Sequence, residues 1–242
     1  MKRILTLQDR LDAVERRLQA ACARSGRSRE EVRIIAVTKY VGTATVLEAL
    51  RCGIRHLGEN RWQQAEPKWR AISGPDAAAD YAVQAVWHFI GSLQSNKVKD
   101  VIDKFTYIHS LDRMSLAQAI DRHAARLGIV VPCFVQVNVS GEQSKHGLAP
   151  EETEHFLKEL AAFRSIRPIG LMTMAPHEED PEATRPVFRQ LRLLRDELNA
   201  RSATAEPLTE LSMGMSNDFE IAVEEGATWI RLGTVLVGKE EV

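Results

Sequence analysis

The chain has 242 residues, of which 44% are hydrophobic and 27% charged, and its 32 Lys and Arg nearly balance its 33 Asp and Glu. This composition is that of an ordinary globular protein and gives no electrostatic reason to expect a nucleic-acid or membrane partner. The apolar run from Ile4 to Leu7 is too short for a signal peptide, and no segment approaches the ~18 apolar residues of a membrane span. Three scattered cysteines encode neither a disulfide framework nor a metal cluster. We therefore expect a cytoplasmic protein.

The first predicted element is an amphipathic helix within residues 1–26. Its apolar residues step by three and four, at Ile4, Leu7, Leu11, Val14, Leu18 and Ala21. Thr6 or Asp9 is suited to begin the helix, because a short polar side chain can cap its first N–H groups. Because this stripe faces one way, we expect the helix to pack on the rest of the protein through a hydrophobic seam.

Eight short apolar runs then alternate with amphipathic segments. The candidate strands are Ile34–Thr38, Arg55–Gly58, Trp87–Gly91, Tyr107–Ser110, Cys133–Val139, Ile169–Met174, Leu208–Met213 and Thr228–Leu232, and helical patterns between them include Thr45–Arg51, Leu116–Leu127, Glu152–Ala162 and Pro186–Leu198. This alternation favours an α/β protein, a single (β/α)₈ TIM barrel preceded by an N-terminal helix, with residues 1–242 as one domain. An open doubly wound sheet is the alternative, but no G-x-G-x-x-G follows the first strand. The sequence ends shortly after Leu232, so the N-terminal helix is expected to fill the place of an eighth outer helix.

Lys39 follows the first candidate strand directly. The run Ile34–Thr38 reads as a strand buried on both faces, and Lys39 places one amine at its C-terminal tip. A partly desolvated lysine is the usual nucleophile toward a carbonyl substrate or a pyridoxal cofactor. A lysine that only extends its amine into solvent remains the alternative at this point.

Two glycine-containing loops follow the last two candidate strands, where barrels of this class commonly bind phosphate. In the first loop Ser216 precedes the helical segment Phe219–Glu224, so a hydroxyl and backbone N–H groups lie at a helix start. In the second, Gly233 and Thr234 allow a phosphate oxygen to approach the backbone. Singly, Ser216 could be a helix cap and Gly233 a packing glycine, but barrel closure makes strands one and eight neighbours and brings Lys39 beside both.

An amine beside a phosphate site predicts a phosphorylated carbonyl ligand, with pyridoxal 5′-phosphate (PLP) foremost. Strand alternation puts Arg231 on the same side of its strand as Gly233, so the guanidinium can reach the pyridine nitrogen. Arginine only donates hydrogen bonds, and it therefore keeps that nitrogen unprotonated. A ring held in this way is a poor electron sink.

Several motifs in this order resemble the pyridoxal phosphate homeostasis proteins. They are Ile35-Ala36-Val37-Thr38-Lys39, His56-Leu57-Gly58-Glu59-Asn60, Trp87-His88-Phe89-Ile90-Gly91, the run Ser140–Gly147, Gly170-Leu171-Met172-Thr173-Met174 and the block Ser212–Thr234. The resemblance implies a barrel like the N-terminal domain of alanine racemase, which carries PLP as an aldimine on Lys39. It also implies phosphate contacts from Ser216, Gly233 and Thr234 and a pyridine contact from Arg231.

Other residues have less specific interpretations. Asn60 either lines the pocket or caps the next helix, and His88 reads as a hydrogen-bonded core histidine. The loop Lys145-His146-Gly147 either meets an anionic group or is solvated, and His177 opens an acidic surface loop. The histidine spacing supports no metal site.

The sequence favours a PLP carrier over an enzyme. Alanine racemase takes a second base, a tyrosine, from an additional C-terminal domain, and here we expect none, with Tyr40 pointing away from the cofactor. We therefore expect a protein of PLP homeostasis that serves PLP-dependent apoenzymes and has no evident catalytic second base. A weak PLP-dependent amino-acid racemase is the alternative, and a class I aldolase without cofactor is a third hypothesis.

Overall fold

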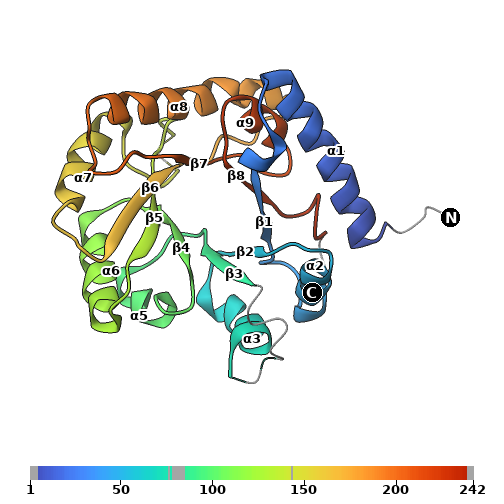
Figure 1. The fold of residues 1–242 in the computed structure, drawn as a ribbon, viewed down its shortest axis with the longest axis horizontal. Helices are drawn as coiled ribbons and strands as arrows, with labels where there is room; N and C mark the ends of the chain where they lie inside the picture. The colour runs from blue at the N-terminus through green and yellow to red at the C-terminus, as the bar shows by residue number, and fades with distance from the viewer. Residues whose placement is uncertain (1–4, 76, 78–84, 143, 239–242) are drawn as a thin grey trace.

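The computed structural model describes residues 5–75, 77, 85–142 and 144–238. Eight parallel strands form a closed barrel in chain order: β1 (Arg33–Val37), β2 (His56–Glu59), β3 (Val86–Phe89), β4 (Tyr107–Leu111), β5 (Val131–Gln136), β6 (Ile166–Met172), β7 (Glu210–Ser212) and β8 (Trp229–Leu232). Around them lie α1 (Leu7–Ser25), α2 (Thr43–Arg51), α3 (Trp62–Ser73), α5 (Val98–Val101), α6 (Met114–Leu127), α7 (Thr153–Leu160), α8 (Arg185–Ala200) and α9 (Phe219–Glu224) (Figure 1). Short 3₁₀ turns occupy Arg29–Glu31, Ser95–Lys97, Pro150–Glu152 and Pro181–Thr184.

The predicted barrel is confirmed, and closure joins the first and last strands. In the pairing of β1 with β8, Ile35 lies opposite Arg231 and Ala36 opposite Leu232. The loop after β8 therefore begins beside the end of β1. This is the neighbourhood that the sequence predicted for Lys39 and Gly233.

Helix α1 begins with a capping box. The Thr6 hydroxyl accepts the Asp9 N–H at 3.1 Å, and the Asp9 carboxylate accepts the Thr6 N–H at 3.0 Å. Gly26 ends the helix in the left-handed conformation, with φ of 67°. Thr6 is therefore the N-cap and Asp9 the third residue of the helix, which confirms the expectation that these residues lie near its start.

The apolar face of α1 packs against the barrel, with α1 lying beside α9 (Figure 1). Leu7, Val14 and Leu18 are fully buried, whereas Leu11 is only half-buried. Ile4, which the sequence also assigned to this face, lies outside the described residues. Ion pairs Arg17–Glu220 at 2.7 Å and Arg24–Glu224 at 2.6 Å border the seam on the α9 side.

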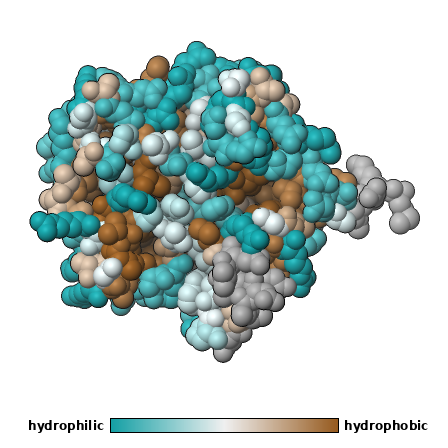
Figure 2. All heavy atoms as spheres, in the orientation of Figure 1, coloured by the Kyte–Doolittle hydropathy of each residue, from teal (hydrophilic) through white to brown (hydrophobic). Residues whose placement is uncertain are grey.

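The two faces of the barrel sheet are covered differently. Between strands and helices lies one large apolar cluster that includes Leu18, Leu57 and Leu111, and hydrophilic residues cover most of the periphery (Figure 2). A small second cluster lies within the barrel and is formed by Ile35, Phe134, Met172 and Trp229, with Tyr107 and Ile169 packed against it. Among the described residues, no helix combines the length and apolar character needed to cross a lipid bilayer.

Candidate functional site

A cleft of about 700 Å³ opens where the strands end at their carboxyl termini. A volume of this size suits a small-molecule ligand. Its lining comes from the ends of six strands and the loops that follow them, and it includes all six residues predicted from the sequence: Lys39, Asn60, Ser216, Arg231, Gly233 and Thr234.

Lys39 lies in a short turn after β1, not on the strand itself, and the turn is held from behind. The buried ammonium of Lys68 on α3 donates to the carbonyl of Thr38 at 2.7 Å and to that of Val41 at 3.4 Å. Lys68 also pairs with the Glu59 carboxylate at 2.5 Å, and the Thr38 hydroxyl donates to Glu59 Oε1 at 2.6 Å. These contacts fix the backbone on both sides of Lys39, so its side chain enters the cleft from a fixed position.

The buried pair Lys68–Glu59 was not predicted from the sequence. Lys68 is 5% exposed and Glu59 is fully buried, an arrangement that proteins tolerate only when both charges are compensated. A signal was present, because Lys68 continues the stripe of Ala65 and Ile72 on the buried face of α3. The second carboxylate oxygen, Glu59 Oε2, has no hydrogen-bond partner.

The structure corrects the expectation that Tyr40 points away from the site. Tyr40 lines the cleft, and its ring centroid lies 4.8 Å from Lys39 Nζ. The expectation assumed that strand alternation continues past Lys39, but the strand ends at Val37 and residues 39 and 40 form a turn. A turn allows successive side chains to reach the same side.

Asn60 lines the cleft and does not cap the following helix. The residue that precedes α3 is Arg61, and no side chain caps this helix. Asn60 Oδ1 is buried without a hydrogen-bond partner, one of three such side-chain atoms in the described part of the chain. Gly91 packs directly behind it, since a Cβ at position 91 would lie 2.3 Å from the Asn60 carbonyl oxygen. An unpaired buried amide oxygen is costly, so Asn60 leaves an unsatisfied acceptor in the lining of the cleft.

The loops after β7 and β8 meet through Ser216 and Gly233. The Gly233 N–H donates to the Ser216 hydroxyl oxygen at 3.2 Å, and the exposed Thr234 follows at the rim. A Cβ at Gly233 would make only ordinary contacts, 3.7 Å from Val37 Cβ, and its φ is not positive. Because neither packing nor backbone geometry demands glycine at 233, the open space over this residue remains available to a ligand.

The charge at this end of the cleft is mixed. Asp218 precedes the six-residue helix α9, and its buried carboxylate accepts the Met215 N–H at 2.6 Å. Burial raises the pKa of the Asp218 carboxyl, while that N–H and the charge of Arg231 oppose the rise. Asp218 thus places a carboxyl group beside the predicted phosphate position, and it was not among the residues predicted from the sequence.

Arg231 is 4% exposed and is anchored at two of its nitrogens. One terminal nitrogen, NH1, donates to Ser212 Oγ at 2.7 Å, and the other, NH2, donates to the carbonyl of Thr173 at 2.9 Å. Burial lowers the pKa of the guanidinium to about 10, with the charge of Asp218 acting in the opposite direction. A guanidinium carries five N–H groups, and these two hydrogen bonds to described residues use two of them, so Arg231 lines the cleft with donor capacity to spare.

His88, His177 and Lys145 lie in three different environments. His88 is a fully buried core histidine with hydrogen bonds on both ring nitrogens, as predicted. His177 lines the cleft, although the sequence indicated only a surface loop, and the carbonyl of its neighbour Glu178 accepts a hydrogen bond from Asn217 at 2.9 Å. Lys145 pairs with Glu142 at 3.3 Å in the loop after β5.

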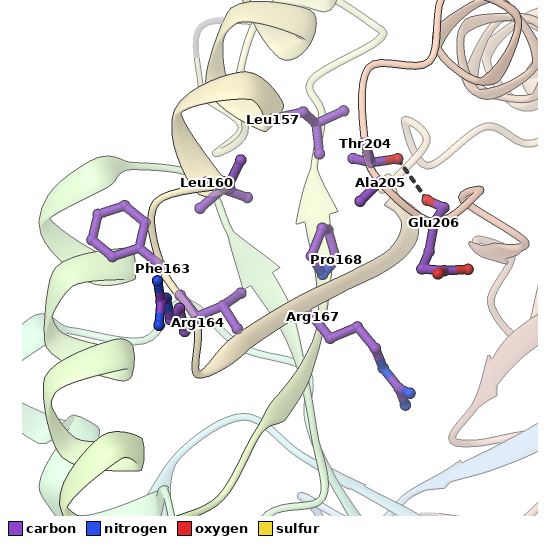
Figure 3. Close-up of a pocket in the computed structure, with 11 residues that line it drawn as sticks. Leu157, Leu160, Phe163, Arg164, Arg167, Pro168, Thr204, Ala205 and Glu206 are labelled. Carbon is purple, nitrogen blue, oxygen red and sulfur yellow. Dashed lines mark hydrogen bonds between the residues drawn. The ribbon is translucent and has the colours of Figure 1, made fainter.

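A smaller cavity of about 230 Å³ lies at the opposite end of the strands, between α7, the start of β6 and the loop Thr204–Glu206 (Figure 3). Leu157, Leu160 and Pro168 provide apolar lining, and the hydrogen bond drawn there joins the Thr204 hydroxyl to the Glu206 carbonyl. No set of polar side chains converges on it comparable to that of the carboxyl-end cleft. We assign it no function.

Comparison with known proteins adds independent information. Residues 10–241 match the family model described as alanine racemase, N-terminal domain. A pyridoxal phosphate homeostasis protein of Aquifex aeolicus (strain VF5) is 42% identical over 233 residues, 96% of this chain and 98% of the relative. Solved structures of PipY from Synechococcus elongatus PCC7942 match without PLP at TM-score 0.83 and 36% identity, and with PLP bound at 0.80 and 35%, each covering 96% of this chain and 100% of PipY. Alanine racemase of Clostridium difficile 630 shares the fold, at TM-score 0.72 and 15% identity over 95% of this chain and 56% of the racemase.

Proposed function

We propose that this chain, which belongs to the family of pyridoxal phosphate homeostasis proteins, holds pyridoxal 5′-phosphate in the carboxyl-end cleft through Lys39. The observation that carries the proposal is the convergence of one amine, one unpaired amide, one buried guanidinium and a hydroxyl–glycine pair on the same cleft. The structure of the relative PipY with PLP bound supports the choice of ligand.

The residues present fit this ligand at each of its functional groups. Bound there, PLP supplies an aldehyde that reacts with amines and an electron-withdrawing ring. Lys39 offers the amine for covalent attachment, and the Asn60 amide can satisfy its unpaired oxygen on the ring hydroxyl. Ser216 and Thr234 offer hydroxyls to the phosphate, and the Gly233 N–H, which donates to Ser216 Oγ at 3.2 Å, would exchange that partner for a phosphate oxygen.

Arg231 favours storage over carbanion chemistry. The guanidinium only donates, so it withholds a proton from a ring nitrogen that it contacts. Its two anchoring bonds, to Ser212 and to the Thr173 carbonyl, prevent it from turning away. Together with the names of the relatives, this supports a carrier that supplies PLP to apoenzymes.

A second candidate, weak amino-acid racemisation, is favoured by one observation. Tyr40 lines the cleft with its ring centroid 4.8 Å from the Lys39 amine, so a phenol and an amine share the same cleft. Proton exchange at the α-carbon of amino acids in deuterated water tests this candidate. We expect exchange far below the ordinary enzyme range of ~1–10³ per second, and turnover within that range would replace the carrier proposal.

The site itself is tested by borohydride reduction of the protein with added PLP, followed by digestion and mass spectrometry. We expect the phosphopyridoxyl group on Lys39 and its loss in Lys39→Ala. Lys145→Ala serves as the matched control, because Lys145 also follows a barrel strand but pairs with Glu142. Labelling of a lysine other than Lys39 in the wild type would refute the proposal.

The phosphate contacts are tested separately from the amine. Lys39→Ala should still bind PLP weakly and reversibly, because the donors of Ser216, Gly233 and Thr234 stay in place. Gly233→Asp should bind less than Lys39→Ala, since it adds negative charge where the phosphate is expected. The variant should fold normally, because position 233 has room for a Cβ and no strained backbone. Equal PLP affinity in Gly233→Asp and wild type would show that the phosphate does not bind beside Gly233.

A further inference from the structure

Three histidines and a serine form a continuous hydrogen-bonded path through the interior of the barrel. His56 Nδ1 lies 3.0 Å from His88 Nε2, and His88 Nδ1 lies 2.9 Å from His109 Nε2. His109 Nδ1 lies 2.9 Å from Ser212 Oγ, which also accepts the bond from Arg231 at 2.7 Å. We call His56, His88, His109 and Ser212 the histidine path. It ends on Arg231, whose guanidinium lines the cleft.

The geometry gives the path a direction. Arg231 can only donate, so Ser212 accepts from it. The buried Ser212 hydroxyl then needs an acceptor for its own proton, and among the described residues His109 Nδ1 is in position to take it. A neutral imidazole has one donor and one acceptor, so His109 then donates through Nε2 to His88, and His88 donates through Nε2 to His56. Burial keeps the rings neutral, because it lowers the pKa of His88 and His109 far below the ordinary value and that of His56 to about 4.

The two ends of the path reach different cavities. His56 lines a cavity of about 640 Å³ at the amino ends of the strands, together with Arg33, Tyr107 and Trp229. Arg231, at the other end, lines the carboxyl-end cleft. The path therefore crosses the barrel from one mouth to the other.

The rings of the path are held by aromatic contacts. His88 stacks on Tyr107 with centroids 4.6 Å apart, and His109 stacks on Phe134 at 4.2 Å. His56 packs edge-on against Trp229 at 4.8 Å. Ring rotation would disturb these contacts, so each imidazole keeps its nitrogens aligned with its neighbours.

We propose that the histidine path is a positioning device for Arg231, which holds the guanidinium in its donor orientation toward the PLP ring. The path does so by giving the Ser212 proton a fixed acceptor, which leaves the Ser212 lone pair facing Arg231. This inference rests on the proposed function, since the ring contact of Arg231 belongs to it. His56, His88 and His109 thereby become determinants of PLP binding without touching the cleft.

The direction of the path is tested without PLP. Nuclear magnetic resonance of the ¹⁵N-histidine-labelled protein at pH 7 distinguishes the two imidazole tautomers, with signals assigned from single-histidine variants. We expect His56, His88 and His109 all as the Nε2–H tautomer. An Nδ1–H tautomer or a charged ring at any of the three would overturn the proposal, whether or not the protein binds PLP.

The effect on the cleft is tested with two substitutions at one position. His109→Phe keeps an aromatic ring on Phe134 but cannot accept the Ser212 proton, whereas His109→Gln can accept through its oxygen and donate through its nitrogen. We expect His109→Phe to shift the absorption maximum of bound PLP and to weaken its binding roughly tenfold, the effect of one lost hydrogen bond. His109→Gln should stay close to wild type. His155→Phe, on the exposed surface of α7, is the control and should change nothing.

The outcomes separate this inference from the proposed function. If wild type binds PLP and His109→Phe binds it with the same affinity and absorption spectrum, the positioning role is wrong while the carrier proposal stands. If His109→Phe does not fold, Ser212→Ala replaces it, because it removes the hydroxyl between His109 and Arg231, and it should shift the PLP absorption in the same way. A Ser212→Ala spectrum identical to wild type would likewise overturn the role. If wild type binds no PLP, the carrier proposal fails, and the tautomers still decide the direction of the path.

Discussion

The outer and inner faces of the barrel sheet differ in chemistry. The outer face, under the helices, carries a large apolar cluster, whereas the inner face carries three histidines, Arg231 and only a small apolar cluster around Phe134. Interiors of such barrels are commonly filled by bulky branched residues. The difference indicates that the outer layer supplies most of the stability, and that the interior gives up apolar packing to hold polar groups in fixed places.

The largest loss of stability is expected when an unpaired charge is left in the outer layer. Lys68→Met leaves the fully buried Glu59 without its partner, and such losses typically cost about 3–5 kcal/mol of unfolding free energy. Urea denaturation measures the loss. Lys158→Met removes an exposed pair with Glu154 and is the control, with an expected cost of at most ~1 kcal/mol. The double variant Glu59→Leu with Lys68→Met should regain most of the stability. A loss of unfolding free energy below 1 kcal/mol in Lys68→Met would show that water reaches Glu59.

A slightly smaller effect is expected from an apolar truncation in the same layer. Leu18→Ala removes a fully buried side chain from the seam between α1 and the barrel, at a typical cost of about 2–5 kcal/mol. The borohydride-trappable adduct on Lys39 should persist, because α1 does not reach the cleft. Leu193→Ala, at a position 53% exposed on α8, should be nearly silent. An unchanged melting temperature in Leu18→Ala would mean that α1 is not part of the outer layer.

The inner face gives the stability of the protein a dependence on pH, because burial keeps the ring of His56 neutral. The unfolded chain protonates its histidines below pH ~6.5, whereas folded His56 resists protonation until about pH 4. Unfolding therefore takes up protons in this window, and the free energy of unfolding should fall as the pH drops from ~6.5 to about 4. His56→Gln should have a shallower fall in thermal denaturation measured across these pH values. Identical slopes in the two proteins would contradict the neutral, buried state of His56.

The smallest effect belongs to the surface. The pair Arg17–Glu220 joins α1 to α9, but its side chains are 40% and 28% exposed. Exposed pairs of this kind contribute about 0–1 kcal/mol, less at high salt. Arg17→Ala should therefore lower the melting temperature only slightly at low salt and not measurably at high salt. A decrease in melting temperature as large as that of Leu18→Ala would show that the ion pair, and not the apolar contacts, stabilises the packing of α1.

Most of the fold could be predicted from the sequence because buried parallel strands read as short apolar runs. Each of the eight strands overlaps its predicted range, and α9 has the predicted bounds Phe219–Glu224. Period-two alternation brought Arg231 and Gly233 to one side of β8, and both line the cleft. Strand ends were less accurate, as with β1, which ends at Val37 and not at Thr38.

The remaining features depend on contacts that a local pattern does not contain. Tyr40 was misplaced because the turn after β1 interrupts the alternation. The Lys68–Glu59 pair requires knowing that α3 packs over the end of β2. The histidine path could not be predicted without the register of β2, β3 and β4. Gly58 pairs with His88, and His88 pairs with Tyr107, so each histidine lies two residues further along the barrel than the one before it.

The seam between α1 and α9 also has a consequence for how the chain is made. Arg17 and Glu220 are 203 residues apart, and β1 likewise pairs with β8 from the far end of the sequence. On a ribosome α1 and β1 emerge long before α9 and β8, which are their partners in the folded barrel. The apolar face of α1 and one edge of β1 are exposed throughout that interval, and contacts of such long sequence separation form slowly. Closure of the barrel therefore needs β8 and comes late in folding, and the chain exposes these apolar and unpaired surfaces until then.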